Sequence, residues 1–139
     1  MTEVFTAEVT IGRPVDSVWA RLIDWDSAAR WMSGVEALRA HGPTAAGTTL
    51  VFTTRGKERT GKVAALDPGR SITLRSVQGG VTADYVYTCA RQAEATRVSL
   101  VADCRMTGPV RLLGPVIRSA IRRADSGQLN AFAATFTPR

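Results

Sequence analysis

The sequence has few of the side chains on which metal and redox sites depend. It contains one histidine, two cysteines and two lysines among 139 residues. His41 stands beside Gly42-Pro43 in an expected loop, and no second imidazole exists to complete a typical zinc site. Cys89 and Cys104 match no metal or redox spacing and lie within strand-like runs, so we predict buried free thiols. We therefore expect no metal ion and no cofactor.

Long apolar runs are also missing. No stretch approaches the roughly 20 apolar residues that cross a bilayer. Residues 1–5 lack the basic and then apolar layout of a signal peptide. The apolar content of 45% is nevertheless enough for a hydrophobic core. We expect a cytoplasmic protein without a membrane span, in which residues 1–139 form one domain; the oligomeric state is not predicted.

The positive charge is spread along the chain rather than gathered in a binding motif. The net charge of +6 comes almost entirely from arginine, since Lys57 and Lys62 are the only lysines. Aromatic residues do not interleave with these arginines, and no nucleic-acid motif is present. The arrangement favours solvated surface charge, and we expect no nucleic-acid partner.

Alternation of apolar and polar residues predicts strands through most of the chain. Residues 3–11 alternate with a period of two, which is typical of a half-buried strand. Six further runs are rich in β-branched residues and tyrosine and are separated by short glycine and proline turns, which favours antiparallel pairing of neighbours. These runs are residues 35–40, 48–54, 58–66, 71–77, 82–90 and 97–106.

Two short helices and one long helix complete the prediction. Pro14 suits a first helical turn before residues 15–22, and a second short helix is expected over residues 26–31 with Asp24 or Asp26 as its N-cap. The long helix spans residues 109–136, where Gly108-Pro109 and Gly114-Pro115 predict a short first segment and a main helix from about Pro115. Its apolar stripe, at steps of three and four, is Leu113, Val116, Ile117, Ala120, Ile121, Ala124, Gln128, Ala131 and Phe132.

This order of elements predicts an α+β fold in which a curved, seven-stranded antiparallel sheet wraps around the long C-terminal helix. A sheet longer than the helix can fill leaves space between the two. Such a space is the usual place for a small ligand.

Strand parity indicates which residues face that space. The inward set comprises Phe5, Ala7, Val9, Leu50, Phe52, Ile72, Leu74, Ser76, Tyr85, Tyr87, Cys89, Val98, Leu100, Ala102, Cys104 and Met106. Tyr85 and Tyr87 can each orient a ligand oxygen, or each can be a core aromatic whose hydroxyl has a protein or solvent partner. Gln128, the one polar residue of the stripe, needs a hydrogen-bond partner unless a bend at Gly127 turns it outward.

Other candidates favour a structural role. We interpret Trp19 as a core residue between helix and sheet, Trp25 as a junction filler, and Trp31 as a residue that closes one mouth of the cavity. Asp84 and Asp103 have outward parity, so surface pairing with Arg97 or Arg105 is the simpler account.

Three stretches of the sequence resemble the START-like, or SRPBCC, superfamily, and within it the polyketide cyclase/dehydrase-like branch. They are Val18-Trp19-x-x-Leu22-x-Asp24-Trp25 followed by Trp31, Thr96-Arg97-Val98, and Leu112-Leu113-Gly114-Pro115-Val116-Ile117-Arg118. The resemblance covers the whole chain and implies the helix-grip fold. The chain departs from the family at Glu94-Ala95, where Gly-Gly is common.

The fold permits three kinds of function. The leading hypothesis is a protein that binds a mainly apolar small molecule, lipid- or polyketide-like, between sheet and C-terminal helix. The resemblance implies a polyketide cyclase/dehydrase as the alternative, with Tyr85 or Tyr87 hydrogen-bonding an enol or carbonyl, and a ligand-free protein-interaction module is the third hypothesis. The candidate ligand-binding residues are Trp31, Phe52, Leu74, Tyr85, Tyr87, Leu100, Ala102, Ile117, Ile121, Ala124 and Gln128.

Overall fold

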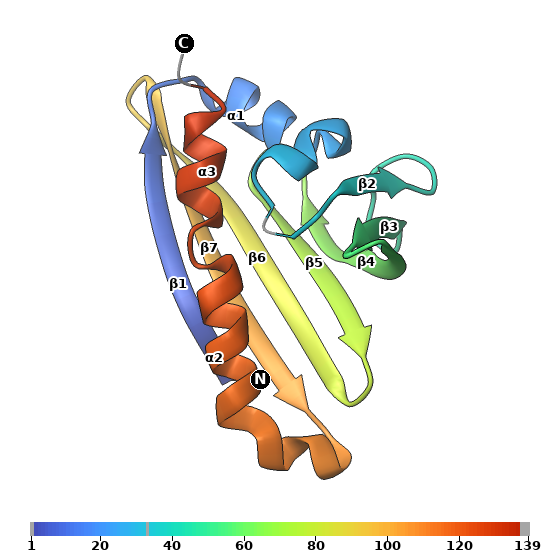
Figure 1. Cartoon of the computed structure of the whole chain (residues 1–139). Helices are drawn as coiled ribbons and strands as arrows, with labels where there is room; N and C mark the ends of the chain where they lie inside the picture. Colours follow the sequence, from blue (N-terminus) through green and yellow to red (C-terminus); the bar gives the residue numbers. More distant parts are fainter. Residues whose placement is uncertain (1, 33, 137–139) are drawn as a thin grey trace.

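Helices cover one face of a curved antiparallel sheet (Figure 1) in the computed structural model, which describes residues 2–32 and 34–136. The strands are β1 (Thr2–Ile11), β2 (Ala37–Ala40), β3 (Thr49–Thr54), β4 (Lys57–Asp67), β5 (Ser71–Gln78), β6 (Val81–Gln92) and β7 (Ala95–Met106). The α-helices are α1 (Val15–Leu22), α2 (Gly114–Asp125) and α3 (Gln128–Ala134), and the 3-10 helices are η1 (Trp25–Arg30) and η2 (Gly108–Leu113). This order confirms the predicted α+β helix-grip fold.

Strands that are consecutive in the chain are neighbours in the sheet, except that β1 pairs with β7. The strand order is β1-β7-β6-β5-β4-β3-β2, and every pair is antiparallel. Each strand from β2 to β6 pairs with the next, and from β3 onward the connections are turns of two or three residues, which favour such pairing. The β3–β4 turn is an example, since Arg55 and Gly56 both have positive φ, at 53° and 74°, as a two-residue hairpin turn of type I′ requires.

A bulge near the start of β1 alters the predicted alternation. The register with β7 shifts between Glu3 and Phe5, so Val4 and Phe5 are both buried although their side chains were expected on opposite faces. The carbonyl of Val4 accepts hydrogen bonds from the guanidinium of Arg122 in α2, at 3.1 Å from Nη2. Beyond the bulge the expected parity holds, with Ile11 buried.

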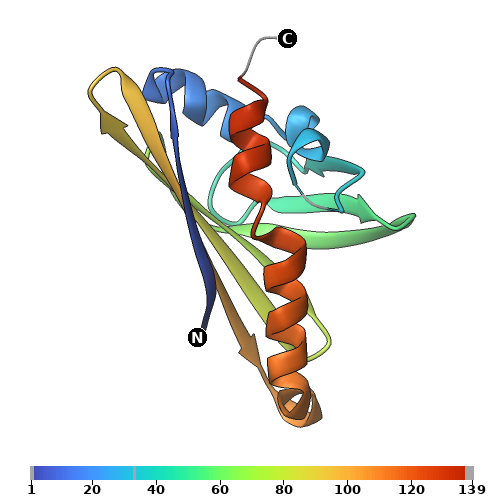
Figure 2. The same ribbon diagram turned by 60° about the vertical axis from the view of Figure 1, so that its left-hand side comes forward.

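The C-terminal helix is interrupted, and its two halves pack differently. After the η2 segment, α2 starts at Gly114 as the Gly-Pro signals predicted, and the break at Ser126 and Gly127 separates it from α3. Gln128 nevertheless points inward and is buried. Figure 2 shows α2 and α3 as successive rods along the concave side of the sheet.

The core is densest beneath α3. Leu129 and Phe132 are fully buried there, and the ring of Trp31 meets the ring of Phe132 edge-on with centroids 4.9 Å apart. By contrast α2 buries only Gly114, and Ile117 and Ile121 are half-buried. The space between sheet and helix is therefore filled at the α3 end and less completely towards α2.

The two thiols and the short helices also bear on the predictions. Cys89 and Cys104 are buried and free, as predicted. The second short helix is a 3-10 helix with Asp24 at its N-cap position, as predicted, but the side chain of Asp24 makes no capping hydrogen bond. The backbone carbonyl of Asp24 instead accepts from the N–H of Ser27 at 3.0 Å. Over the described residues, every helix is too short or too polar to span a bilayer.

Candidate functional site

A cavity of about 210 Å³ lies between the sheet and the junction of α2 with α3. Strands β2 to β6 contribute lining residues, and Met32 and Val35 line it from the segment after η1. Its border consists of Met32, Val35, Leu38, Leu50, Phe52, Thr54, Gly61, Lys62, Leu74, Arg75, Ser76, Gln78, Tyr85, Tyr87, Asp125 and Gln128. The cavity is large enough for a small organic ring, because a cavity of about 150 Å³ in another protein holds benzene.

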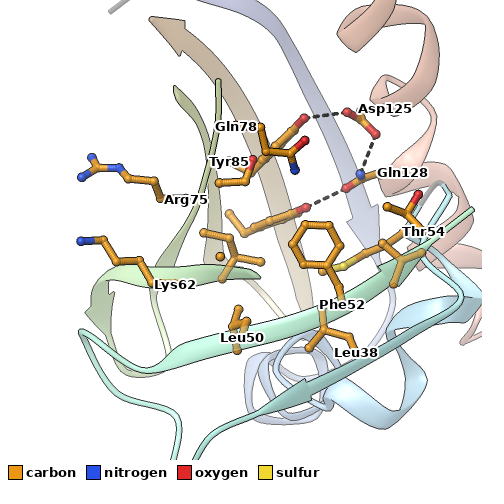
Figure 3. Close-up of a pocket in the computed structure, with 16 residues that line it drawn as sticks. Leu38, Leu50, Phe52, Thr54, Lys62, Arg75, Gln78, Tyr85, Asp125 and Gln128 are labelled. Carbon is orange, nitrogen blue, oxygen red and sulfur yellow. Dashed lines mark hydrogen bonds between the residues drawn. The ribbon is translucent and has the colours of Figure 1, made fainter. Parts of the chain in front are cut away.

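One wall of the cavity is apolar. Leu38, Leu50 and Phe52 face it from the neighbouring strands β2 and β3 (Figure 3). Leu74 also lines it, from β5. Leu38 and Phe52 are directly opposite in the register, so their side chains share a face of the sheet. This wall supplies a surface for an apolar ring or chain.

The opposite wall is a hydrogen-bonded chain of four polar side chains. The Tyr85 hydroxyl donates to Oδ2 of Asp125 at 2.6 Å, and the Tyr87 hydroxyl donates to Oε1 of Gln128 at 2.6 Å. Nε2 of Gln128 donates to Oδ1 of Asp125 at 3.1 Å, which joins the two pairs (Figure 3). We call Tyr85, Tyr87, Asp125 and Gln128 the polar tetrad.

Two secondary-structure periods bring the tetrad together. Tyr85 and Tyr87 are two residues apart on β6 and so face the same side of the sheet. Asp125 and Gln128 are three residues apart across the α2–α3 break, about one helical turn. The ring of Trp31 packs edge-on against that of Tyr87, with centroids 5.7 Å apart, and fixes the phenol from behind.

Burial sets the protonation of the tetrad. Burial raises the pKa of the Asp125 carboxyl above its usual range, although the hydrogen bonds from Tyr85 and Gln128 oppose this. Burial, reinforced by the charge of Asp125, also raises the pKa of both tyrosines. The two phenols therefore keep their protons at neutral pH and act as the donors of the tetrad.

The hydrogen-bond directions decide what the tetrad can offer to a ligand. Both tyrosine protons are already donated within the protein, so each phenol oxygen has only accepting capacity left. The carboxylate of Asp125 is also an acceptor, and the second N–H of Gln128 is the one proton of the tetrad without a partner among the described residues. The wall thus favours a ligand group that donates a hydrogen bond, and the expected donation from Tyr85 or Tyr87 to a carbonyl would first require breaking a protein hydrogen bond.

The two cationic residues at the border contribute little charge to the interior. Arg75 binds Asp84 through two hydrogen bonds, of 2.7 and 2.8 Å, on the outer face of the sheet. Figure 3 shows the head groups of Lys62 and Arg75 directed away from the tetrad. The prediction that Asp84 pairs with Arg97 or Arg105 at the surface is wrong, because Asp84 is buried beneath Arg75 and Arg97 lies near Glu8 instead.

Five of the eleven candidate ligand-binding residues border the cavity: Phe52, Leu74, Tyr85, Tyr87 and Gln128. The other six lie outside it. Leu100, Ala102 and Trp31 are buried in the core, Ile117 and Ile121 pack against the core from α2, and Ala124 is exposed. Trp31 supports Tyr87 from behind and does not close a mouth of the cavity.

Asp125 lies on the inner face of the helix, although the predicted apolar stripe does not include it. The predicted stripe runs through its neighbour Ala124 instead, which is exposed in the structure. The spacing contained the correct signal, since Asp125 follows Ile121 by four residues and precedes Gln128 by three. A charged residue within an apolar stripe is a candidate site residue because it is costly to bury without partners.

The remaining polar candidates lie apart from the cavity. His41 is exposed in a loop. Trp25 is buried and donates its indole N–H to Oγ1 of Thr44 at 3.0 Å, as a junction residue would. In the part of the chain that the structure describes, no three His, Cys, Asp or Glu side chains gather as metal ligands do.

Solved structures share this architecture at low sequence identity. The Zhui aromatase/cyclase from Streptomyces sp. R1128 matches with a TM-score of 0.74 and 19% identity over 94% of this chain and 91% of that one. A START superfamily protein from Mycobacterium smegmatis matches with a TM-score of 0.72 and 12% identity over 94% of each chain. A protein from Thermus thermophilus matches with a TM-score of 0.71 and 19% identity, covering 95% of this chain and 98% of that one. These likenesses define the protein as one with a START-like helix-grip fold.

The sequence itself identifies the family. Residues 2–137 match the family described as polyketide cyclase / dehydrase and lipid transport, and the chain belongs to this family. A search of curated proteins finds no match to the sequence. The resemblance inferred from the tryptophan and Gly-Pro motifs is thereby confirmed.

Proposed function

We propose that residues 1–139 form a binding domain for a small, mainly apolar molecule, lipid- or polyketide-like, which carries a hydroxyl group. The observation that carries the proposal is the polar tetrad facing an apolar wall across a cavity of about 210 Å³. The apolar part of the ligand packs against Leu50, Phe52 and Leu74. Its hydroxyl donates to the tetrad, which has spare acceptors.

The size of the cavity supports a ligand that is small or only partly enclosed. Pockets that enclose a drug-sized molecule usually measure about 300–1,000 Å³. This cavity is below that range, and the exposed side chains of Lys62 and Gln78 stand at its border. We infer that a ring or a chain end enters the cavity while the rest of a larger molecule extends past this border.

Two measurements test the proposal. Native mass spectrometry of freshly purified protein should show a co-purifying small mass. Displacement of an apolar reporter dye should then rank 2-naphthol above naphthalene and 2-methoxynaphthalene, because of these three only the naphthol can donate a hydrogen bond. Equal binding of the three probes would contradict a role for the tetrad as acceptor.

A matched pair of variants locates the binding. Gln128→Met keeps the side-chain length and removes the bonds to Tyr87 and Asp125, so it should reduce the preference for naphthol. Gln92→Met makes the same change at an exposed position at the end of β6 and should leave that preference unchanged. An unchanged preference in Gln128→Met would place the binding site elsewhere.

A polyketide cyclase/dehydrase is the second candidate, and the Tyr85–Asp125 pair favours it. A carboxyl whose pKa is raised by burial is a suitable group to exchange a proton with a bound molecule. The cavity would hold the substrate folded, which lowers the entropic cost of ring closure. Incubation with a β-hydroxy ketone probe should then give a product lighter by one water with the parent protein and none with Asp125→Asn; an unchanged probe with both would leave binding alone.

A further inference from the structure

Three large aliphatic side chains project into solvent between the end of β7 and the first turn of α2. Leu112 is 86% exposed, Leu113 55% and Val116 67%, whereas nearly all other large apolar residues that the structure describes are buried or half-buried. We call these three residues the aliphatic tip. They lie on η2 and the first turn of α2, at the lower end of the molecule in Figure 2.

The η2 segment is anchored in this position. The N–H of Thr107 donates to the carbonyl of Gly80 in the β5–β6 turn at 2.8 Å. Gly80 is required there, because a Cβ atom would lie 2.4 Å from the Thr107 oxygen and 2.8 Å from Cγ1 of Val110. With Val110 held against the hairpin on one side, the aliphatic tip occupies the free side of the turn.

The chain on either side of the aliphatic tip carries only positive charge, from the end of β7 up to the last turn of α2. Between Asp103 and Asp125 the chain has no acidic residue and five arginines: Arg105, Arg111, Arg118, Arg122 and Arg123. Arg111 and Arg123 are exposed, and the ion pairs found among the described residues include none of the five. The guanidinium of Arg118 folds back along α2, where a Cβ on Gly114 would lie 3.1 Å from its Nη1.

We propose that the aliphatic tip and its arginines dock the protein on an anionic lipid surface. In this arrangement Leu112, Leu113 and Val116 enter the boundary between head groups and acyl chains, and the arginines contact lipid phosphates. Binding of this kind combines buried apolar area with attraction to anionic lipids and remains reversible. It requires no membrane-spanning helix.

The positive charge favours a lipid surface over two other partners, a second copy of the protein and a nucleic acid. In a two-fold contact between copies, the same patch meets itself and would bring the arginines of both copies together without acidic partners. A nucleic acid would attract the arginines but would leave the aliphatic tip in water. A lipid surface with anionic head groups offers an apolar boundary to the aliphatic tip and phosphates to the arginines.

Vesicle flotation of the full chain tests the proposal. The protein should float with phosphatidylcholine vesicles containing about one-third phosphatidylglycerol and bind vesicles of phosphatidylcholine alone far more weakly. Leu112→Gln with Leu113→Gln should weaken binding at least about tenfold, from the loss of buried apolar area. Arg111→Gln with Arg123→Gln should weaken it about thirtyfold, given the usual contribution of each basic residue near such a surface.

The matched control removes two exposed arginines elsewhere. Arg30→Gln with Arg91→Gln lowers the net charge equally and should bind close to the parent level. Equal loss in the two arginine pairs would show that only net charge matters and would overturn the proposal, as would parental binding by the leucine variant.

Two other outcomes would assign the patch to a different partner. A lipid-free dimer that the leucine variant disperses would assign it to contact between copies, and duplex DNA that outcompetes the vesicles would assign it to nucleic acid. Circular dichroism verifies that each variant is folded.

Discussion

The hydroxyl of Tyr87 donates a 2.6 Å hydrogen bond to Oε1 of Gln128, 41 residues later in the chain, and so ties β6 to the first turn of α3. Both residues are buried, with exposed fractions of 2% and 6%. A buried polar pair of this kind holds the helix at one height above the sheet, because any displacement leaves two groups unsatisfied. The bond therefore fixes the position of the cavity as well as its polarity.

We expect Tyr87→Phe to lower the free energy of unfolding by about 1–3 kcal/mol, because Oε1 of Gln128 would remain buried without a donor. A domain of this length should then melt about 3–6 °C lower for each kcal/mol. Combining Tyr87→Phe with Gln128→Met should cost less than the sum of the two single changes, with a coupling of about 0.5–3 kcal/mol. Thermal unfolding of all four proteins measures this coupling, and simple additivity would show that the pair is not energetically linked.

Asp125 predicts how stability depends on pH. Its folded pKa is raised by burial, so between the unfolded value of about 3.9 and the folded value the native state binds more protons than the unfolded state. Stability contributed by this group therefore falls as pH rises through that window. The melting point of the parent should decline relative to Asp125→Asn from about pH 4 upward. Glu94→Gln, at an exposed hairpin position, should follow the parent, and parallel curves for parent and Asp125→Asn would refute the linkage.

Gly61 borders the cavity where β4 passes close to β5. A Cβ atom on Gly61 would lie 2.8 Å from the backbone oxygen of Arg75, so a strand would have to move. We expect Gly61→Ala to cost about 1–3 kcal/mol, in the range of other overpacking changes, and to weaken dye binding. Gly12→Ala is the control, because a Cβ there meets no heavy atom within 4 Å. Similar melting points for the two variants would show that the strands yield easily.

The two thiols should resist alkylation. Cys89 and Cys104 are buried, and burial raises the pKa of Cys89 to about 11 and also raises that of Cys104. Little reactive thiolate therefore forms at neutral pH. Mass spectrometry after iodoacetamide treatment should find neither residue modified in the native protein and both modified in guanidinium chloride. Fast modification of the native protein would mean that β6 and β7 open readily.

Residue patterns were sufficient for the fold because each element had its own local signal. The period of two from Glu3 to Ile11 and the Gly114-Pro115 start of α2 depend only on neighbouring residues, and both were located to within one or two positions. The site depends on rotation of the helix about its axis. Turning the helix by one residue brings Asp125 to the inner face in place of Ala124. Amphipathic spacing alone cannot determine this rotation, because it treats a charged residue as solvent-facing even when the side chain has buried partners on β6.

The cavity was also expected further along α2 than it lies. The sequence indicates an apolar stripe but gives no measure of how far the sheet curls, and this curl decides where helix and strands separate. Ile117 and Ile121 therefore pack against the core, while the break at Gly127 places Gln128 over the cavity. Interactions between residues far apart in sequence, such as Tyr85 with Asp125, become visible only in the structure.

The bulge at Val4 limits strand pairing between copies of this protein at high concentration. β1 is a long edge strand, and a flat edge of that length would offer backbone groups to a strand of another molecule. The register shift bends this edge, and the carbonyl of Val4 is occupied by Arg122 from the same chain. The run of β1 open to intermolecular pairing is thereby shortened, which protects the protein against aggregation by strand addition.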